Sequence, residues 1–115
     1  MVCGKLEIDI LNAFWNLTQD DEDRDISIQD VVDKLSQSGV ERAYTTIKTV
    51  MDRLTVKSLL VRYKSGKKFF YRAAMSKNEM AAESVDTLVE NFFDGEPVKL
   101  LRFVERECLE QITEK

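Results

Sequence analysis

The sequence predicts a mostly helical α+β fold in which one helix leads directly into a short β-hairpin. Between residues 43 and 58, apolar side chains recur at the three-and-four spacing of a helix. From residue 59 onward, two runs rich in β-branched and aromatic residues, LLVRY and KFFYRA, flank a Lys-Ser-Gly-Lys turn. This order is the outline of a winged helix-turn-helix domain, in which the helix enters a DNA groove and the hairpin contacts the DNA backbone.

Positive charge is concentrated in the same stretch. Residues 42–72 hold nine basic side chains and one acidic side chain, a net charge of +8, whereas the whole 115-residue chain carries −4. A basic patch on an acidic protein indicates a polyanionic partner, because the overall charge says little about a segregated patch. A solvated hairpin with ordinary surface lysines is the alternative, and the coincidence of charge with the helix-and-hairpin pattern favours nucleic acid.

The composition argues against several classes of protein. The length fits one small domain, or one domain with an appendage. No apolar run is long enough to span a membrane, and the N-terminus lacks the pattern of a secretory signal. The chain has no histidine, and Cys3 and Cys108 are far apart, so we predict no metal site, no cofactor and reduced thiols in a cytoplasmic protein. Without the commonest general base, an enzyme is not expected.

Two helices are predicted ahead of the basic stretch. Residues 4–18 form an amphipathic helix, with Trp15 expected to be a core residue. Residues 19–26 contain five acids in six positions without the spacing of a calcium loop, so we expect a solvated, flexible turn. Ser27 and Asp30 match the capping box of a second helix, which Gly39 ends in a left-handed conformation.

The third helix, over residues 43–58, is the candidate for reading DNA. Its first turn presents Tyr44, Thr45 and Thr46, where short hydroxyl side chains and free backbone N–H groups can reach phosphates or base edges. Simple helix capping is the alternative role for each threonine.

The alternation of residue types predicts which face of the hairpin is buried. Apolar and basic residues alternate from Val61 to Lys64, so we expect Val61 and Tyr63 to face the core and Arg62 and Lys64 to face out. In the second strand, Phe69 and Tyr71 should share one face and Phe70 and Arg72 the other. Cross-strand packing is favoured over base stacking for these aromatic residues.

The C-terminal part, residues 75–115, is predicted to be a two-helix dimerisation arm after a winged-helix domain over residues 1–74. Ser76 and Glu79 match a capping box, and the break at Gly95 and Pro97 separates the two helices. Their apolar faces exceed what a three-helix domain covers, so they should bury against a second copy; folding back on their own domain is the alternative. The last stripe is expected to continue through Ile112, and the predicted dimerisation residues are Val85, Leu88, Val89, Phe92, Phe93, Leu101, Val104 and Cys108, with packing favoured over redox sensing for the cysteine.

Motifs along nearly the whole chain resemble the penicillinase-repressor family of bacterial winged-helix regulators (the BlaI, MecI and CopY type). The most specific part is the third-helix pattern from Tyr44-Thr45-Thr46 to Lys57, followed by a wing pattern from Lys64 to Tyr71. Supporting matches are Leu6–Leu11 with Phe14 and Trp15, Ser27–Val31, and Phe103-Val104-Glu105.

The resemblance implies a transcriptional repressor that binds a pseudo-palindromic operator in double-stranded DNA as a homodimer. It assigns DNA contacts to positions in the third helix and the wing. Together with the neighbouring first-turn and basic residues, the candidate DNA-binding residues are Tyr44, Thr45, Thr46, Lys48, Thr49, Arg53, Arg62, Lys64, Lys67 and Lys68. The alternative is a winged-helix interaction module whose basic face binds an acidic partner protein.

Three positions depart from the family pattern. Ser58 stands where the family has glycine after the third-helix lysine. Copper-responsive members carry a C-terminal cluster of cysteines, and this chain has only Cys108 there, so copper sensing is not predicted. β-Lactam-responsive members are cut by a membrane protease at an Asn-Phe bond in the last helix; the matching pair here is Arg102-Phe103, and Asn91-Phe92 lies earlier. The sequence therefore predicts no particular inducing signal or protease.

Overall fold

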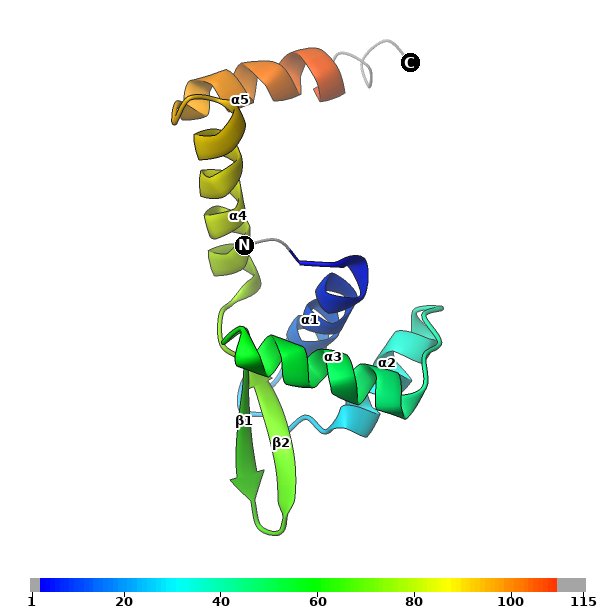
Figure 1. The fold of residues 1–115 in the computed structure, drawn as a ribbon. Helices are drawn as coiled ribbons and strands as arrows, with labels where there is room; N and C mark the ends of the chain where they lie inside the picture. Colours follow the sequence, from blue (N-terminus) through cyan, green and yellow to red (C-terminus); the bar gives the residue numbers. More distant parts are fainter. Residues whose placement is uncertain (1–2, 110–115) are drawn as a thin grey trace. The chain divides into compact units, whose positions relative to one another are not determined.

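The computed structural model describes residues 3–109 and has the element order of a winged helix-turn-helix domain followed by two further helices (Figure 1). This confirms the predicted fold class. No helix among these residues is long and apolar enough to cross a membrane. The chain divides into two compact units, one ending at Lys77 and the other beginning at Asn78. The elements are α1 (Lys5–Leu17), α2 (Ile28–Gln37), α3 (Tyr44–Val56), β1 (Leu60–Ser65), β2 (Lys68–Ala73), α4 (Lys77–Phe92), α5 (Pro97–Val104) and a π-helical turn (Glu105–Leu109).

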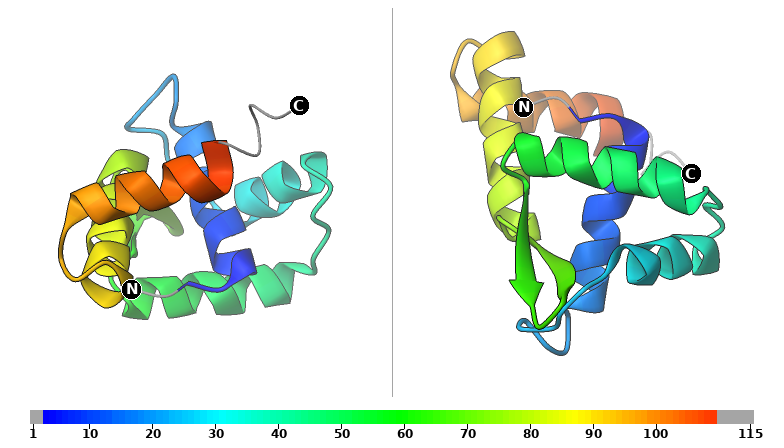
Figure 2. Two further views of the ribbon diagram at one scale, coloured as in Figure 1. Left: turned by 90° about the horizontal axis from the view of Figure 1, so that it is seen from above. Right: turned by 60° about the horizontal axis from the view of Figure 1, so that its bottom comes forward.

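The first unit has one hydrophobic core, to which all three of its helices and the base of its hairpin contribute. Helix α1 packs against both α2 and α3 (Figure 2). Burying each large apolar side chain stabilises the fold by about 1.5–3 kcal/mol before entropy is counted. The fully buried residues with the largest side chains are Phe14, Ile10, Leu11, Ile26, Ile47, Met51, Leu54, Leu60 and Val31.

Helix α2 begins and ends as its sequence predicts. Ser27 Oγ accepts a hydrogen bond from the Asp30 N–H at 3.1 Å, and the Asp30 carboxylate accepts one from the Ser27 N–H at 3.0 Å. This confirms the capping box, which satisfies two of the orphan donors at the helix start. Gly39 has φ of 86°, which confirms the left-handed residue after the helix.

Helix α3 ends in a left-handed residue that is not glycine. Ser58 has φ of 64°, and the Leu59 N–H reaches back to the Leu54 carbonyl at 2.9 Å. This backbone path closes the helix and delivers Leu59 into the core, where it is buried. A side chain with a Cβ atom costs about 1 kcal/mol in this conformation, so the serine adds strain where the related pattern has glycine.

Trp15 lies at the edge of the core rather than inside it. Its ring is half-buried, and its indole N–H donates to the Met75 carbonyl oxygen at 3.0 Å. The expectation of a simple core residue is therefore wrong. The bond fixes the segment that follows β2 against α1.

The buried face of the hairpin is the opposite of the one predicted for β1. The register pairs Leu60 with Ala73 and Arg62 with Tyr71, and the buried side chains are Leu60 and Tyr71. Arg62 therefore shares the face that leads into the core, whereas Val61 is exposed and points to the other side. The alternation of residue types alone could not decide which set of β1 side chains faces the core, because Leu59 and Leu60 are consecutive apolar residues and both are buried. The prediction that Phe69 and Tyr71 share a face is confirmed.

The second unit consists of α4, a tight turn, α5 and the π-helical turn. Asp94 and Gly95 both have positive φ, and Pro97 begins α5 as predicted. The Lys99 ammonium pairs with Asp94 at 2.7 Å and with Glu96 at 2.8 Å, which closes the turn and raises the pKa of Lys99.

The last helix is not the continuous α-helix that the sequence predicted. Its α-helical part ends at Val104, and residues 105–109 have the wider i→i+5 bonding of a π-helix. Cys108 therefore does not continue the apolar stripe at α-helical spacing. Ile112 lies outside the described residues.

Candidate nucleic-acid interface and C-terminal apolar surface

The start of α3 and one face of the hairpin line a common groove. Helix α3 contributes Tyr44 and Lys48, and the hairpin contributes Arg62, Lys68 and Phe69. Tyr71, the α2 N-cap residue Ser27 and the first residue of α2, Ile28, complete the groove. Six of the ten candidate DNA-binding residues do not line it but are exposed on the same helix and hairpin; they are Thr45, Thr46, Thr49, Arg53, Lys64 and Lys67.

The first turn of α3 offers hydroxyl groups that do not serve the helix start. The residue before the helix is Ala43, and no side chain caps the helix. Helix capping is therefore wrong as the role of Thr45 and Thr46, whose side chains are exposed. Thr49 donates its hydroxyl to the Thr45 carbonyl oxygen at 2.9 Å, which leaves its hydroxyl oxygen as an acceptor.

Two basic side chains of α3 have different surroundings. The Lys48 ammonium is 3.0 Å from the Asp52 carboxylate, and this hydrogen bond raises the pKa of Lys48. The pair is solvent-exposed, so a phosphate can replace the carboxylate at little cost. The Arg53 side chain is exposed and makes no hydrogen bond or ion pair with the described residues.

The hairpin holds two cations against one aromatic ring. The Arg62 guanidinium lies 4.7 Å from the centroid of the Phe69 ring, and the Lys64 ammonium lies 5.8 Å from it. Such cation–π contacts hold both positive groups on the groove side of the hairpin. Phe69 is 52% exposed and was missed as a candidate site residue. The sequence held the signal, since a large aromatic side chain stands directly beside Lys68 in a basic turn.

Lys57 does not belong to the basic surface, although the sequence places it in the basic stretch. Its ammonium lies 2.8 Å from the carboxylate of Glu7, which is only 6% exposed and also accepts the Gly4 N–H at 3.0 Å. The hydrogen bond from Lys57 lowers the pKa of Glu7. This pair was not predicted. The sequence does place the acid Glu7 one helical turn before Ile10 and Leu11, on the apolar side of the helix, where a buried carboxylate needs a partner.

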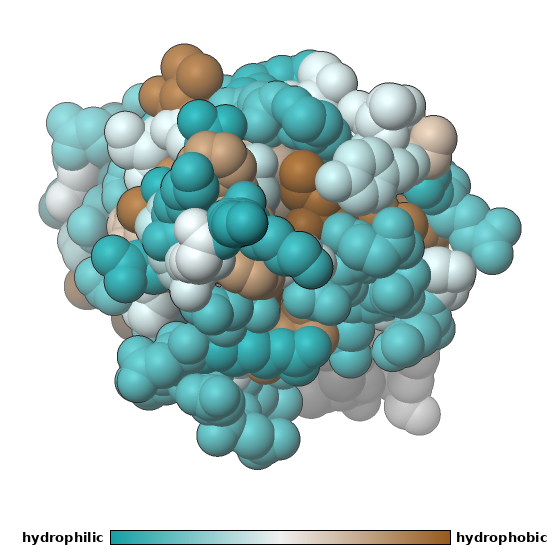
Figure 3. Space-filling view, turned by 90° about the horizontal axis from the view of Figure 1, so that it is seen from below, coloured by the Kyte–Doolittle hydropathy of each residue, from teal (hydrophilic) through white to brown (hydrophobic). Residues whose placement is uncertain are grey.

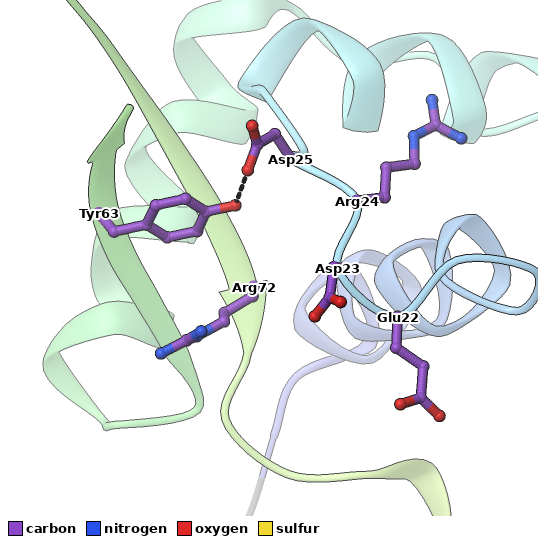
Figure 4. Close-up of a pocket in the computed structure, with 6 residues that line it drawn as sticks. All are labelled: Glu22, Asp23, Arg24, Asp25, Tyr63 and Arg72. Carbon is purple, nitrogen blue, oxygen red and sulfur yellow. Dashed lines mark hydrogen bonds between the residues drawn. The ribbon is translucent and has the colours of Figure 1, made fainter. Parts of the chain in front are cut away.

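Arg72 also lies away from the groove, on the other face of the hairpin. Its guanidinium is 5.6 Å from the centroid of the Tyr63 ring, and both residues line a pocket with the acidic loop (Figure 4). The Tyr63 hydroxyl donates a hydrogen bond to the Asp25 carboxylate, which raises the pKa of Tyr63 to about 12. The expectation of a solvated turn agrees with the exposure of residues 20–25, but the Tyr63–Asp25 hydrogen bond ties this end of the loop to the hairpin, so the expected flexibility is wrong there.

The surface around the hairpin tip is mainly hydrophilic. Seen from below, charged and polar side chains dominate, and apolar side chains occur as separate patches between them (Figure 3). Gly66 has φ of 66°, a value that glycine adopts readily, and it lies in the tight turn between the strands. Lys67 and Lys68 directly after it have exposed side chains. This surface can meet a hydrated polyanion without burying a large apolar area.

The predicted dimerisation residues are mostly exposed. Val89 is buried, and the Phe93 ring packs within the unit against Phe103 with ring centroids 5.3 Å apart. Val104 is half-buried, and Cys108 is exposed. The remaining four, Val85, Leu88, Phe92 and Leu101, are exposed, as are three apolar residues absent from the prediction, Val98, Phe103 and Leu109.

Comparisons with known proteins agree with this architecture. A solved structure of the ferric uptake regulator from Francisella tularensis, with iron, superimposes with a TM-score of 0.52. Its sequence is 17% identical over 80% of each chain, so the likeness shows a shared fold. Within the described residues of this protein, no three cysteine or acidic side chains are grouped so as to hold a metal ion.

The family assignment rests on the sequence. A search of curated proteins gives no match. A family model described as penicillinase repressor matches residues 3–115, almost the whole chain. The fold, the basic groove and this match lead to one conclusion: the chain belongs to the penicillinase repressor family and is a winged-helix, DNA-binding transcriptional regulator, not an enzyme.

Proposed function

We propose that this protein is a sequence-specific repressor that binds a pseudo-palindromic operator as a homodimer. The observation that carries the proposal is the groove in which the first turns of α3 meet the basic face of the hairpin. One element there can enter a major groove while the other contacts the adjacent backbone.

Helix α3 supplies the residues that distinguish one DNA sequence from another. Thr45, Thr46 and Thr49 offer hydroxyl groups and methyl groups for base edges, and Arg53 offers a guanidinium to guanine or phosphate. The first-turn backbone N–H groups of α3 favour a phosphate beside Tyr44. None of these side chains is needed in the core, because the buried face of α3 is formed by Ile47, Val50, Met51 and Leu54.

The wing supplies affinity that depends little on sequence. Arg62, Lys64, Lys67 and Lys68 bring positive charge to the hairpin, and each phosphate they neutralise releases a counterion. Lys48, which lines the groove, exchanges Asp52 for phosphate in the complex. Lys57 and Arg72 take no part, because Lys57 is paired with Glu7 and Arg72 lies over the Tyr63 ring on the other face of the hairpin.

A second copy of the chain completes the site. One α3 and one wing contact too few base pairs to select one operator among genomic competitors. We propose residues 1–74 as the DNA-binding domain and residues 75–115 as the dimerisation region, where Phe92 and Leu101 are 75% and 62% exposed. Two recognition helices then enter successive major grooves about 34 Å apart, and the dimer blocks a promoter. Such a regulator acts where the DNA is, in the cytoplasm.

The test is selection of bound fragments from random double-stranded DNA, followed by salt titration. We expect enrichment of two inverted half-sites separated by about one helical turn, with Lys67→Ala lowering the salt slope by about one unit. Lys34→Ala, which removes the same charge from α2, is the matched control and should leave the slope unchanged. No enrichment, together with binding to an acidic protein, would favour the interaction-module alternative.

The Thr49→Ala variant distinguishes base recognition from phosphate binding. We expect this variant to change the preferred bases at one position of each half-site, with the salt slope retained. An equal loss of affinity on all sequences would remove Thr49 from base recognition.

A further inference from the structure

The hairpin needs support from outside itself to keep its position. It has only two strands, and an isolated two-stranded hairpin is marginally stable in water. Its tip nevertheless carries the proposed phosphate contacts Lys67 and Lys68, which must lie at a fixed distance from α3 to engage one DNA duplex. Whatever fixes the hairpin therefore controls the geometry of the groove.

The support comes from the end of the acidic loop. The Tyr71 N–H donates to the Ile26 carbonyl at 2.8 Å, so residue 26 pairs with β2 through a single antiparallel β-bridge. One residue earlier, the Asp25 carboxylate accepts the hydrogen bond from the Tyr63 hydroxyl. Adjacent residues of the loop thus hold both strands of the hairpin, β2 through its backbone and β1 through a side chain.

The chemistry of the Tyr63–Asp25 hydrogen bond suits a contact that persists at every physiological pH. A hydrogen bond from a hydroxyl to a carboxylate is charge-assisted and stronger than one between neutral groups. It raises the pKa of Tyr63 to about 12, so the donor stays protonated at every physiological pH. The side chains of Arg24 and Glu22 point away from the Tyr63 hydroxyl, and only Asp25 reaches it (Figure 4).

We propose that Asp25 and Tyr63 are positioning residues for the wing: their hydrogen bond holds the hairpin at the angle that DNA binding requires. Neither residue touches DNA in this account. Tyr63 lies on the hairpin face opposite Arg62 and Phe69, and Asp25 is an acid that the DNA backbone would repel. The proposal rests on the proposed DNA binding of the wing.

Charge and positioning predict opposite effects for one substitution. Asp25→Asn removes a negative charge near the DNA, which by electrostatics alone would tighten binding. If the hydrogen bond positions the wing, the same substitution weakens binding because the neutral amide is a poorer acceptor. Asp23→Asn is the matched control, since its carboxylate lines the same pocket and makes no side-chain hydrogen bond within the described chain.

The experiment measures DNA affinity and its salt slope for the full-length variants. We expect Asp25→Asn and Tyr63→Phe each to weaken binding about three- to tenfold and to lower the salt slope, as the wing cations disengage. The double variant should bind no more weakly than the weaker single variant. Asp23→Asn should bind equally well or more tightly. Tighter binding by Asp25→Asn, equal to that of Asp23→Asn, would overturn the proposal.

A second wing variant separates positioning from a general loss of folded protein. If Tyr63→Phe displaces the wing, Lys67→Ala should lose most of its effect in that background. Full additivity of Tyr63→Phe and Lys67→Ala would overturn the proposal. If Lys67→Ala weakens DNA binding and Tyr63→Phe does not, only the positioning role of Asp25 and Tyr63 is contradicted. If Lys67→Ala changes neither the affinity nor the salt slope, the DNA contact of the wing in the proposed function is contradicted.

Discussion

The two compact units use apolar residues in opposite ways. In the first unit, large apolar side chains such as Phe14 are completely buried among helices α1–α3 and the hairpin. In the second, Phe92 and Leu101 remain exposed, although the Phe93 ring, just after α4, packs against Phe103 of α5. The first unit has a hydrophobic core of its own, while the second leaves large apolar side chains exposed, as surfaces that bind a partner do. This difference is the reason why we propose that the first unit contacts DNA and the second joins two copies of the chain.

Substitution of the same residue type in each unit should have the most contrasting effects. Phe14→Ala leaves a cavity in the core and should lower the free energy of unfolding by about 3–5 kcal/mol. Phe92→Ala removes no intramolecular core contact, so unfolding measured at a concentration where the chain is monomeric should change little. Urea denaturation of both variants makes the comparison. A large loss in Phe92→Ala under these conditions would show that α4 is buried against its own chain.

The second prediction concerns the apolar surface itself. Phe92→Ala should weaken the dimer by about 2 kcal/mol, or roughly 30-fold in its dissociation constant, because the buried ring is lost from the interface. Val56→Ala is the control, since Val56 is 85% exposed in α3 of the first unit. Sedimentation equilibrium across a range of concentrations measures both constants. If the two substitutions changed the dimer dissociation constant equally, the second unit would have no special role in dimerisation.

Within the first unit, the Glu7–Lys57 pair should matter next most. Glu7→Gln leaves the Lys57 ammonium without its carboxylate and should cost about 2 kcal/mol. Because the folded-state pKa of Glu7 is lowered below 4.5, the contribution of the pair is fully present above pH 4.5. It is lost as the pH falls through the lowered value. Denaturation at several pH values should therefore show the two proteins converging in acid; a constant gap would contradict the pair's role.

The smallest effect has the opposite sign. Ser58→Gly relieves the left-handed strain at the end of α3 and should stabilise the first unit by about 1 kcal/mol at most, since the added freedom of the unfolded glycine offsets part of the gain. Ser38→Gly is the comparison, because Ser38 has negative φ of −90° and gains nothing. Thermal unfolding distinguishes them, and destabilisation by both substitutions would show that Ser58 is not strained.

Local patterns predicted the order of elements well because each was encoded within a few residues. The Ser27–Asp30 capping box, Gly39 and Pro97 lie where they were expected, and the third helix and hairpin follow one another as predicted. For the groove, the sequence predicted individual side chains but not their arrangement. The structure adds Phe69 to the groove and shows that Lys57 and Arg72 lie outside it.

Two of the missed features are contacts between distant segments. Lys57 and Glu7 are 50 positions apart, and Tyr63 and Asp25 are 38 apart. Neither pairing leaves a periodic signal in the sequence. The face of β1 predicted to be buried was wrong because two consecutive leucines, Leu59 and Leu60, stand where the strand begins, and only the packing of Leu60 and Tyr71 into the core selects one face. The π-helical turn after Val104 also has no local signature that we recognise.

The central claim is that two copies of the groove, joined through the second unit, bind one operator. Sedimentation velocity of the protein with a selected two-half-site duplex tests it most directly. The account predicts a saturated complex of two chains per duplex, which Phe92→Ala forms only at higher protein concentration. A saturated complex of one chain per duplex, with affinity unchanged by Phe92→Ala, would contradict it.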